Sequence, residues 1–406
     1  MSADHAEGVS IRRAGKQALA EALQASRSDT LDTLALYEAA FADTGFVVPQ
    51  RSELNPPLWE MGHINWFQQH WLKRNPQWRR GVDADPFVAR HAAARPDADA
   101  LYDSSNVPHD TRWALPLPDA QATRSDLARG LAHSLALLQE CGDDDQSLYF
   151  HRLCLFHEDM HHEAALYSAQ SLGLAVADAR WQTQPLRAAA TQLKVDAGHR
   201  RLGSTPADGF AFDNELAAHA VNLPACRIDS TVLHWADFLP FVDAGGYASD
   251  RCWSPAGLAW RKTQLQTAPR YLRRDGAGWQ HLQWGRWQAL DLTLPACHLS
   301  AFEAQAWCAW AGRRLPTEAE WERAALTHPA DFDWGQVWEW TASEFLPYPG
   351  FVAHPYRDYS APWFGSRSVL RGASFGTQAR LKNPRYRNFF PPDRNDIFAG
   401  FRSCAP

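Results

Sequence analysis

The chain has 406 residues, of which 45% are hydrophobic, and a formal net charge of −6 at neutral pH. This length exceeds what one ordinary hydrophobic core organises and predicts two domains. The slight acidity offers no basic surface for nucleic acid, and no apolar run reaches the roughly 18 residues that span a bilayer, so neither nucleic acid nor membrane is expected as a partner. The seven scattered cysteines include no Cys-x-x-Cys pair and the N-terminus has no apolar leader, which indicates a cytoplasmic protein with reduced thiols.

The first 180 residues are predicted to form a helical bundle. Hydrophobic side chains recur at helical spacing in four segments, which are Ala18–Phe41, Pro57–Lys73, Ser125–Cys141 and Gln146–Leu174. Between the second and the third segment, residues 76–118 form a long connection rich in proline and aspartate, and connections of this length are often functional. Four helices with one long connection make a bundle, and the interior of such bundles is a common place for metal ions.

The chain after about Leu193 is predicted to form an α+β domain. Short β-branched or aromatic runs alternate with Gly, Pro and Asp, and helical periodicity is confined to Leu233–Ala244, Ser300–Ala311 and Thr317–Leu326. Residues 177–190 form the expected linker. We therefore predict a helical domain at residues 1–180 and an α+β domain at residues 193–406.

The most informative segment lies in the fourth predicted helix and reads His157-Glu158-Asp159-Met160-His161-His162-Glu163. His157 and His161 are four residues apart, so on a helix their Cβ atoms lie about 5–6 Å from each other and the two side chains can hold one metal ion. The alternative is a pair of partly exposed helix histidines that bind nothing. A single helix does not easily present a third ligand to the same ion, so the rest of a metal site must come from elsewhere in the chain.

A zinc protease is the first rival function, because the same segment satisfies His-Glu-x-x-His, in which the glutamate is a general base. Such enzymes complete the zinc site with a later glutamate or with a third histidine in His-x-x-Gly-x-x-His. Here no acid or histidine occurs between Glu163 and Asp178. The sequence therefore disfavours this class.

His63 is the best-placed candidate for the third imidazole. It lies in the segment Pro56-Pro57-Leu58-Trp59-Glu60-Met61-Gly62-His63-Ile64-Asn65-Trp66-Phe67, where proline in the first turn starts a short helix. Ile64 and Phe67 would then face the bundle core. His162 lies about 100° around the helix from His161 and is expected beside the site or in solvent. The remaining alternatives for the third ligand are His70, His109, His133 and His151.

These segments carry a resemblance to a known family. Pro-Pro-Leu-Trp-Glu-x-Gly-His-Ile-x-Trp-Phe followed by His-Glu-x-x-His-x-Glu resembles the DinB-like metal-binding domain of the ergothioneine-type sulfoxide synthases. The second half resembles the partner domain of the same enzymes, a C-type-lectin-like fold shared with formylglycine-generating enzyme. The matching stretches of the second half are residues 210–215, 312–322, 337–341, 369–374 and 399–402.

The resemblance implies a mononuclear non-heme Fe(II) held by His63, His157 and His161, with O₂ as co-substrate. In the family, iron and O₂ couple a thiol to C2 of the imidazole of hercynine, which is trimethylhistidine. Spacing alone does not distinguish iron from zinc, since both accept three histidines. By resemblance, hercynine binds at Asn388-Phe389-Phe390, with its trimethylammonium group on aromatic faces and its carboxylate or ring on Asn388.

Three departures from the family concern the second substrate. Met160 stands where the enzyme that uses γ-glutamylcysteine carries a glutamine. Residues 101–113 lack the paired arginines that bind the peptide carboxylates, and offer instead polar side chains such as Asn106 and a single Arg112. Phe390 replaces the acid that holds the peptide's amino group.

These departures lose charged contacts and gain neutral polar ones, which favours a hydroxyl-rich donor. A related branch, the selenoneine synthases, joins a 1-seleno-sugar to hercynine, and the sequence is interpreted as closest to that branch. The first alternative is a sulfoxide synthase that uses γ-glutamylcysteine or cysteine. The second is a non-catalytic metal-binding scaffold.

The proton donor is the least defined part of the expected site. The family's catalytic tyrosine follows Trp-Glu-Trp-Thr, and an approximate count places Phe351 at its position. Tyr356 is the candidate replacement, with Tyr348 and His354 as alternatives. Further residues are expected to be structural, namely Trp338, Trp340, Arg371 and Arg402, whereas Asp213-Asn214-Glu215 could either turn the chain or bind a structural Ca²⁺.

Overall fold

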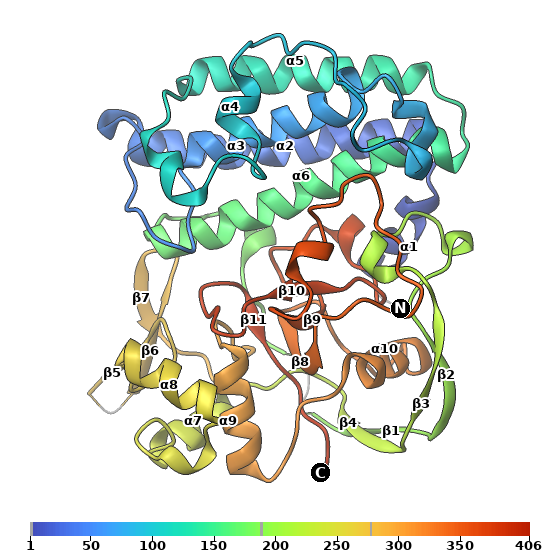
Figure 1. Cartoon of the computed structure of the whole chain (residues 1–406). Coiled ribbons are helices and arrows are strands. Elements are labelled where there is room, and N and C mark those ends of the chain that lie inside the picture. The colour runs from blue at the N-terminus through green and yellow to red at the C-terminus, as the bar shows by residue number, and fades with distance from the viewer. Residues whose placement is uncertain (1–2, 187–189, 277) are drawn as a thin grey trace.

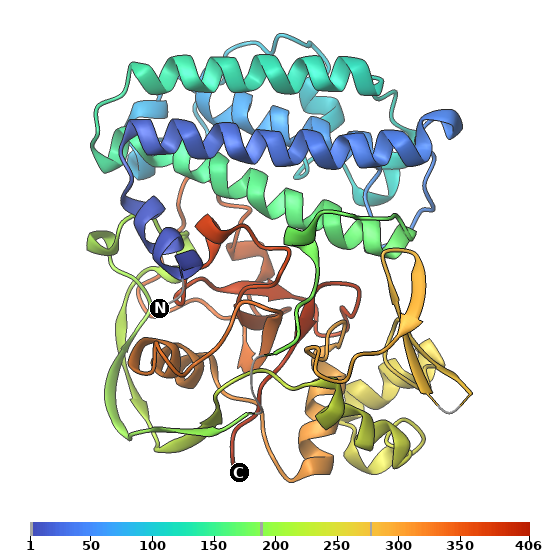
Figure 2. The same ribbon diagram turned by 180° about the vertical axis from the view of Figure 1, so that it is seen from behind.

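The structure is a computed structural model that describes residues 3–186, 190–276 and 278–406, and it consists of a layer of long helices on an α+β body (Figure 1). Within the described residues, the long helices of the layer are α2 (Lys16–Phe41), α3 (Pro57–Gln68), α5 (Ala120–Gln139) and α6 (Asp145–Leu172). Each overlaps one of the predicted helical segments. The helix α6 lies between the rest of the layer and the body, as both views show (Figure 2).

The ends of α6 and α3 follow from the local sequence. The Asp144 side chain accepts a hydrogen bond from the backbone N–H of Ser147 at 2.9 Å, which caps the start of α6. Gly173 ends α6 in the left-handed conformation, at φ 73°. In α3, a proline occupies the first turn and the helix continues into a wide π-type turn at Gln69–Lys73. The predicted helix Pro57–Lys73 is therefore correct in extent but not in the geometry of its end.

The long connection between α3 and α5 packs against the bundle. It contains α4 (Ala98–Tyr102) and 3₁₀ turns at Trp78–Asp83 and His109–Ala114. The Trp59 indole N–H donates to the carbonyl of Leu101 at 2.7 Å, which fixes α4 on α3. The connection thus runs beside the two helices that carry the histidines of the motif.

The helices of the second half are α7 (Trp235–Asp243), α8 (Pro255–Gln264), α9 (Ala301–Ala311) and α10 (Glu318–Thr327). Three of them confirm predicted helices. The fourth, α8, was missed, although its start carries a readable signal. The Ser254 hydroxyl accepts from the backbone N–H of Gly257 at 3.2 Å, and Pro255 occupies the first turn.

The strands of the described residues form one four-stranded sheet and three smaller ones. The large sheet has the order β10-β9-β8-β11, antiparallel except for the parallel pair of β11 and β8. Its strands are β8 (Trp338–Glu344), β9 (Ser368–Gly372), β10 (Asn388–Phe390) and β11 (Ala399–Gly400). The smaller sheets pair β1 (Gln192–Val195) with β4 (Cys226–Asp229), β2 (Gly198–Leu202) with β3 (His219–Leu223), and β6 (Gly278–Gln283) with β5 (Leu272–Asp275) and β7 (Arg286–Ala289). The expected α+β class of this half is confirmed.

Buried ion pairs organise the interior of the α+β body. Arg402 is fully buried and bonds both carboxylate oxygens of Glu339 on β8, at 2.5 and 2.7 Å. Arg371, also fully buried, pairs with Glu322 of α10. Such pairs need complete hydrogen bonding to offset the loss of hydration. The structural role expected for Arg371, Arg402 and the fully buried Trp340 is confirmed.

Two contacts show how the N-terminus and the Asp213-Asn214-Glu215 turn are used. Glu215 accepts from Arg12 at 2.7 Å, and Asp213 accepts from Ser360 at 2.5 Å, so both carboxylates have partners in the protein. The helix α1 (Ala3–Ser10) lies beside the α+β body in both views. A Cβ at Gly8 would come within 1.8 Å of the carbonyl oxygen of Lys382, so only glycine permits this approach.

The domain division at residues 180 and 193 stays a prediction, since α1 packs on the second half while its sequence belongs to the first. All seven cysteines lie in the described part of the chain and are free thiols, as expected. No helix among the described residues is long and apolar enough to cross a bilayer.

Candidate metal centre

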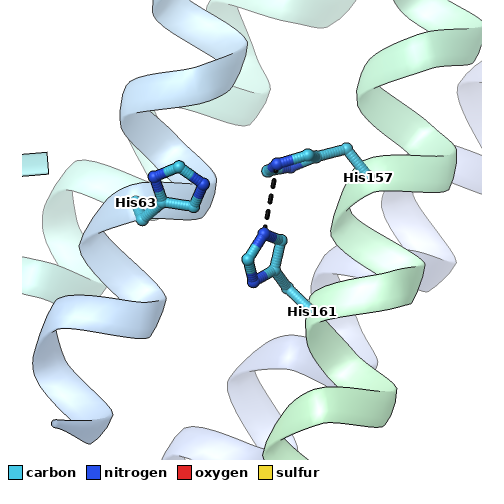
Figure 3. A group of neighbouring side chains, drawn as sticks. All are labelled: His63, His157 and His161. Carbon is cyan, nitrogen blue, oxygen red and sulfur yellow. Dashed lines mark hydrogen bonds between the residues drawn. The ribbon is translucent and has the colours of Figure 1, made fainter. Parts of the chain in front are cut away.

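Three histidines from two helices meet in the bundle (Figure 3). His63 comes from α3, and His157 and His161 come from successive turns of α6. The Nε2 atoms of His157 and His161 are 3.1 Å apart, and the nearest ring nitrogens of all three histidines lie within 4.8 Å of one another. The structure therefore brings together the three residues that the sequence singled out.

Hydrogen bonds on the outer side of two rings fix their orientation. The Nδ1 atom of His63 lies 2.8 Å from the carbonyl oxygen of Tyr102, and Nδ1 of His161 lies 2.5 Å from Oε1 of Glu60. Each Nδ1 thus carries the proton, which leaves Nε2 with its lone pair toward the centre. A Cβ at Gly62 would come within 2.2 Å of the Tyr102 ring, so glycine beside His63 allows the close packing that supplies this carbonyl.

The third ring is held by packing. His157 stacks on Phe67 with the ring centroids 3.5 Å apart and the planes 3° from parallel. Burial, reinforced by the neighbouring His161, holds the pKa of His157 well below its usual value. The same two causes lower the pKa of His63 to about 3. Both imidazoles are therefore neutral at physiological pH, which is the form that binds a metal ion.

The separation of His157 and His161 fits two ligands of one first-row divalent cation. Imidazole nitrogens bind such ions at about 2.1 Å, so two adjacent ligands of an octahedral ion lie about 3.0 Å apart. The separation of 3.1 Å between His157 and His161 matches this spacing. A donor set of three imidazole nitrogens suits iron or zinc, and a cavity lies beside it.

The acids of the motif bond to groups other than the three histidines. Glu158 accepts from Arg27 of α2 at 2.6 Å and is fully buried, so it cannot act on a water at the histidines. This arrangement excludes the zinc-protease hypothesis, in which that glutamate is the general base. Asp159 accepts from Arg380 at 2.7 Å, and Glu163 accepts from Trp338 at 2.8 Å. These two acids join α6 to the α+β body.

The other histidines considered as ligands are not part of the centre, although His109 lines the cavity beside it. His162 is buried against Trp181 with the ring centroids 4.9 Å apart, so the expectation of a place beside the site or in solvent was wrong. The four alternative ligands all have other partners, since His70 accepts from Arg90, His109 bonds the Leu54 carbonyl, His133 contacts Lys73, and His151 bonds the Ser134 carbonyl.

A cavity of about 720 Å³ opens beside the histidines, between the bundle and the α+β body. Most of the predicted substrate-binding residues line it, namely Met160, Arg112, Asn388, Phe389 and Phe390. Asn106 does not line it. That side chain is exposed and donates to Asp103 at 2.8 Å, whereas its neighbours Ser104 and Ser105 reach the cavity. The Ser105 hydroxyl donates to Asp358 at 2.6 Å and joins the two halves of the rim.

Among the candidates for a proton donor, Tyr356 lies nearest the centre. Its ring packs edge-on against Phe67 at 4.9 Å and His157 at 6.2 Å, and it lines the cavity. Burial, and then the charge of Asp358, raises its pKa above the usual value, so it remains a phenol. The other candidates face elsewhere, because Tyr348 donates to Glu318, His354 bonds Tyr149, and Phe351 packs on Phe364.

Two further tyrosines were missed by sequence reasoning. The hydroxyls of Tyr359 and Tyr386 lie 3.0 Å apart, and they contact the Met160 sulfur at 3.7 and 3.2 Å. Both line the cavity. No spacing rule joins them, because a loop brings one and the segment before β10 brings the other. Glu60 was also missed as a partner of His161, although it stands three residues before His63 in the quoted motif.

The cavity wall is more acidic than basic. Its lining includes four carboxylates, of Glu53, Glu60, Glu163 and Asp358, and a single guanidinium, of Arg112. Burial opposes ionisation of Glu60, but the adjacent His161 outweighs it and lowers the pKa of this carboxyl. Burial raises the pKa of Glu163, against the hydrogen bonds that it accepts.

Comparison with known proteins gives matches over both halves. The family model described as a sulfatase-modifying factor enzyme 1-like domain matches residues 178–336 and 330–405. The chain is 30% identical to the hercynine oxygenase of Mycolicibacterium smegmatis, over 95% of this chain and 98% of that protein. It is 32% identical to the hercynine oxygenase of Mycobacterium tuberculosis, over 86% and 90%. It is 26% identical to the formylglycine-generating enzyme of Streptomyces coelicolor, over 53% and 88%.

Proposed function

The chain belongs to the family of ergothioneine-type sulfoxide synthases, as do the hercynine oxygenases, and from this premise we propose that it is an Fe(II)- and O₂-dependent oxygenase that joins a 1-seleno-sugar to C2 of the hercynine imidazole. The formylglycine-generating-enzyme-like fold expected for the second half is confirmed. The observation that carries the proposal is the group of three histidines beside a cavity lined by the expected substrate residues. We also propose a cytoplasmic location, which the free thiols support.

His63, His157 and His161 would hold the iron. When bound there, Fe(II) would supply the redox chemistry that links O₂ to bond formation at the hercynine ring. The protein's own contribution is to present three imidazoles, two of them oriented by hydrogen bonds and the third by stacking, and to place them beside a cavity of about 720 Å³. The stacking of His157 on Phe67 also shields one side of the centre from water.

The cavity offers hercynine a place for each of its groups. Phe389 and Phe390 provide aromatic faces for the trimethylammonium group, and such contacts are worth about 0.5–2 kcal/mol each. Asn388, at the start of β10, supplies a polar contact for the carboxylate or the ring. Tyr356 is proposed as the phenol that delivers a proton at the reacting end, since it lies beside His157.

The charges of the cavity favour a neutral donor. A γ-glutamylcysteine molecule carries two carboxylates and would face Glu53, Glu60 and Asp358 with only Arg112 to pair them. A buried charge left without a partner costs several kcal/mol. Ser104 and Ser105 offer hydroxyl contacts to a sugar instead, and Met160 offers a polarisable sulfur beside the two phenols.

The alternative is a sulfoxide synthase that uses γ-glutamylcysteine or cysteine, and the hercynine oxygenase relatives favour it directly. A non-catalytic scaffold would purify without stoichiometric iron. The test is to incubate the Fe(II)-loaded protein with hercynine, O₂ and either a 1-seleno-sugar or γ-glutamylcysteine, and to identify the product by mass. A hercynine–selenium adduct is expected. Product from the peptide alone would assign the sulfoxide synthase activity.

A further inference from the structure

We propose that Arg112, Asn55 and Glu60 form a relay through which a carboxylate bound in the cavity controls the orientation of the His161 imidazole. Glu60 and Asn55 are then positioning residues, and Arg112 is the residue that meets the ligand. The inference rests on the proposed role of His161 as a metal ligand, and it deepens that role by linking substrate binding to the metal site.

The relay is a continuous chain of short hydrogen bonds. Arg112 donates from Nη1 to Oδ1 of Asn55 at 2.8 Å, and Asn55 donates from Nδ2 to Oε2 of Glu60 at 2.8 Å. The other oxygen of Glu60 lies 2.5 Å from Nδ1 of His161. All four residues line the same cavity. Each link is within the range of a strong hydrogen bond, and each involves an ionic group, the guanidinium in the first link and the Glu60 carboxylate in the other two.

The two ends fix the amide of Asn55 in one orientation. Its oxygen must face the guanidinium, which only donates, and its NH₂ must face the carboxylate, which only accepts. The flipped amide would place two donors together and two acceptors together, with a loss at both links. A movement of Arg112 is therefore passed to Glu60 rather than absorbed by a rotation of the amide.

A second contact ties the same guanidinium to His63. Arg112 lies over the Trp59 ring with its central carbon 3.8 Å from the ring centroid. Trp59 in turn stacks on His63, with centroids 5.0 Å apart and planes 9° from parallel. Arg112 thus supports two of the three histidines, one through hydrogen bonds and the other through stacked rings.

The guanidinium at the far end of the relay lines the cavity and has no carboxylate partner among the described residues, which indicates a carboxylate ligand. Arg112 is 9% exposed, and within the described residues its Nε–H has no hydrogen-bond partner and no carboxylate is bonded to its guanidinium. A half-satisfied buried guanidinium is costly, so a carboxylate that enters the cavity gains a strong contact there. A carboxylate on Arg112 competes with Asn55 for the guanidinium. The hydrogen bond from Asn55 to Glu60 then changes, and with it the hydrogen bond between Glu60 and His161.

The same hydrogen bonds could have a purely structural role, in which they only hold α3 to the connection that follows it. The test therefore needs a measurement at the metal. Fe(II)-loaded protein under nitric oxide gives an electron paramagnetic resonance signal that reports the ligand field of the iron. The probes are hercynine and trimethylhistamine, which has the same imidazole and trimethylammonium groups but no carboxylate. The hercynine carboxylate is thereby assigned to Arg112, and the ring to Asn388. In the unmodified protein, hercynine is expected to shift the signal and trimethylhistamine to shift it differently.

Two variants break the relay at different links. Glu60→Gln and Asn55→Leu are each expected to give the same signal with hercynine as with trimethylhistamine, with kcat for hercynine lowered about 10–100-fold. Using both guards against a folding defect in one, and circular dichroism checks each. Ser168→Ala is the matched control, because Ser168 lines the same cavity outside the relay and should keep the difference between the two probes.

The outcomes separate the inference from the proposed function. Iron uptake with identical signals for both probes in the unmodified protein would overturn the relay alone. So would a difference between the probes that persists in both variants. An unmodified protein that takes up no iron contradicts the proposed function, and the relay with it.

Discussion

The helical wall of the cavity and the wall supplied by the α+β body differ in chemistry and in construction. The helical wall presents imidazoles and the carboxylates of Glu60 and Glu163, and its side chains stand on rigid turns of α3 and α6 with bonded partners behind them. The opposite wall presents phenols and phenyl rings from a loop and from the short strand β10. The first wall suits an ion, which needs fixed distances, and the second suits an organic substrate, which needs matching surfaces.

The largest effect is expected when an imidazole is removed from the helical wall. His63→Ala, His157→Ala and His161→Ala should each abolish iron binding, because loss of one of three ligands exceeds the about 10–100-fold cost of losing an outer contact. Iron per protein after anaerobic loading is the measurement. His162→Ala, next to a ligand but packed on Trp181, is the control and should keep most of the iron. A full complement of iron in any of the first three variants would refute the site.

The second prediction concerns the charged side chains that select the donor, which come from both walls of the cavity. Because a peptide with two carboxylates leaves at least one of them unpaired in the acidic cavity, kcat/KM for γ-glutamylcysteine should be at least about 10³ lower than for a 1-seleno-sugar. Phe390→Asp should move the preference back toward the peptide by offering an acid to its amino group. Steady-state kinetics with both donors measures this. Equal turnover of the peptide by the unmodified protein would contradict it.

The third prediction concerns the stability of the helical wall, which depends on a buried ion pair behind the histidines. Arg27 and Glu158 form a buried pair behind the histidines, with exposed fractions of their side chains of 2% and 0%. Arg27→Ala leaves Glu158 charged and unpaired and should lower the free energy of unfolding by about 3–5 kcal/mol. Denaturant unfolding measures the loss. The exposed pair of Arg79 and Glu140 is the matched control, and Arg79→Ala should cost at most about 1 kcal/mol. A similar small loss in both variants would show that the buried pair adds nothing.

The smallest effect is expected on the aromatic wall. Phe389→Ala and Asn388→Ala should each weaken hercynine binding by about 0.5–2 kcal/mol, without a change in iron content. Calorimetric titration under anaerobic conditions gives the affinity. Phe389 also stacks on Phe345 at 4.0 Å, so part of its loss can appear as lower stability, which Asn388→Ala avoids. Unchanged affinity in both variants would rule out this pocket.

The residues of the helical wall could be predicted from the sequence, whereas several residues of the opposite wall could not. His157 and His161 were predictable because one turn of a helix sets their distance, and His63 because its helix start is written in the sequence. The pair of Tyr359 and Tyr386 was not, since a loop decides where a hydroxyl points and no local rule relates residues that far apart. The place of His162 was misjudged for a related reason, as the angle around a helix does not say which neighbour covers that face.

The fold could be predicted to a similar degree. Periodicity predicts the long helices and three helices of the second half. It does not predict α8, although Ser254 as the N-cap and Pro255 in the first turn are a typical helix start. The role of Glu158 also needed the structure, because the residue satisfies a protease motif in sequence and only its bond to Arg27 shows that it faces away from the centre.

The central claim is that one metal ion on three histidines lies between these two walls. An anaerobic crystal structure of the protein with Fe(II) and hercynine tests it most directly. It should show iron on Nε2 of His63, His157 and His161, with the hercynine trimethylammonium group against Phe389 and Phe390. Iron bound elsewhere, or hercynine outside the cavity, would contradict the account.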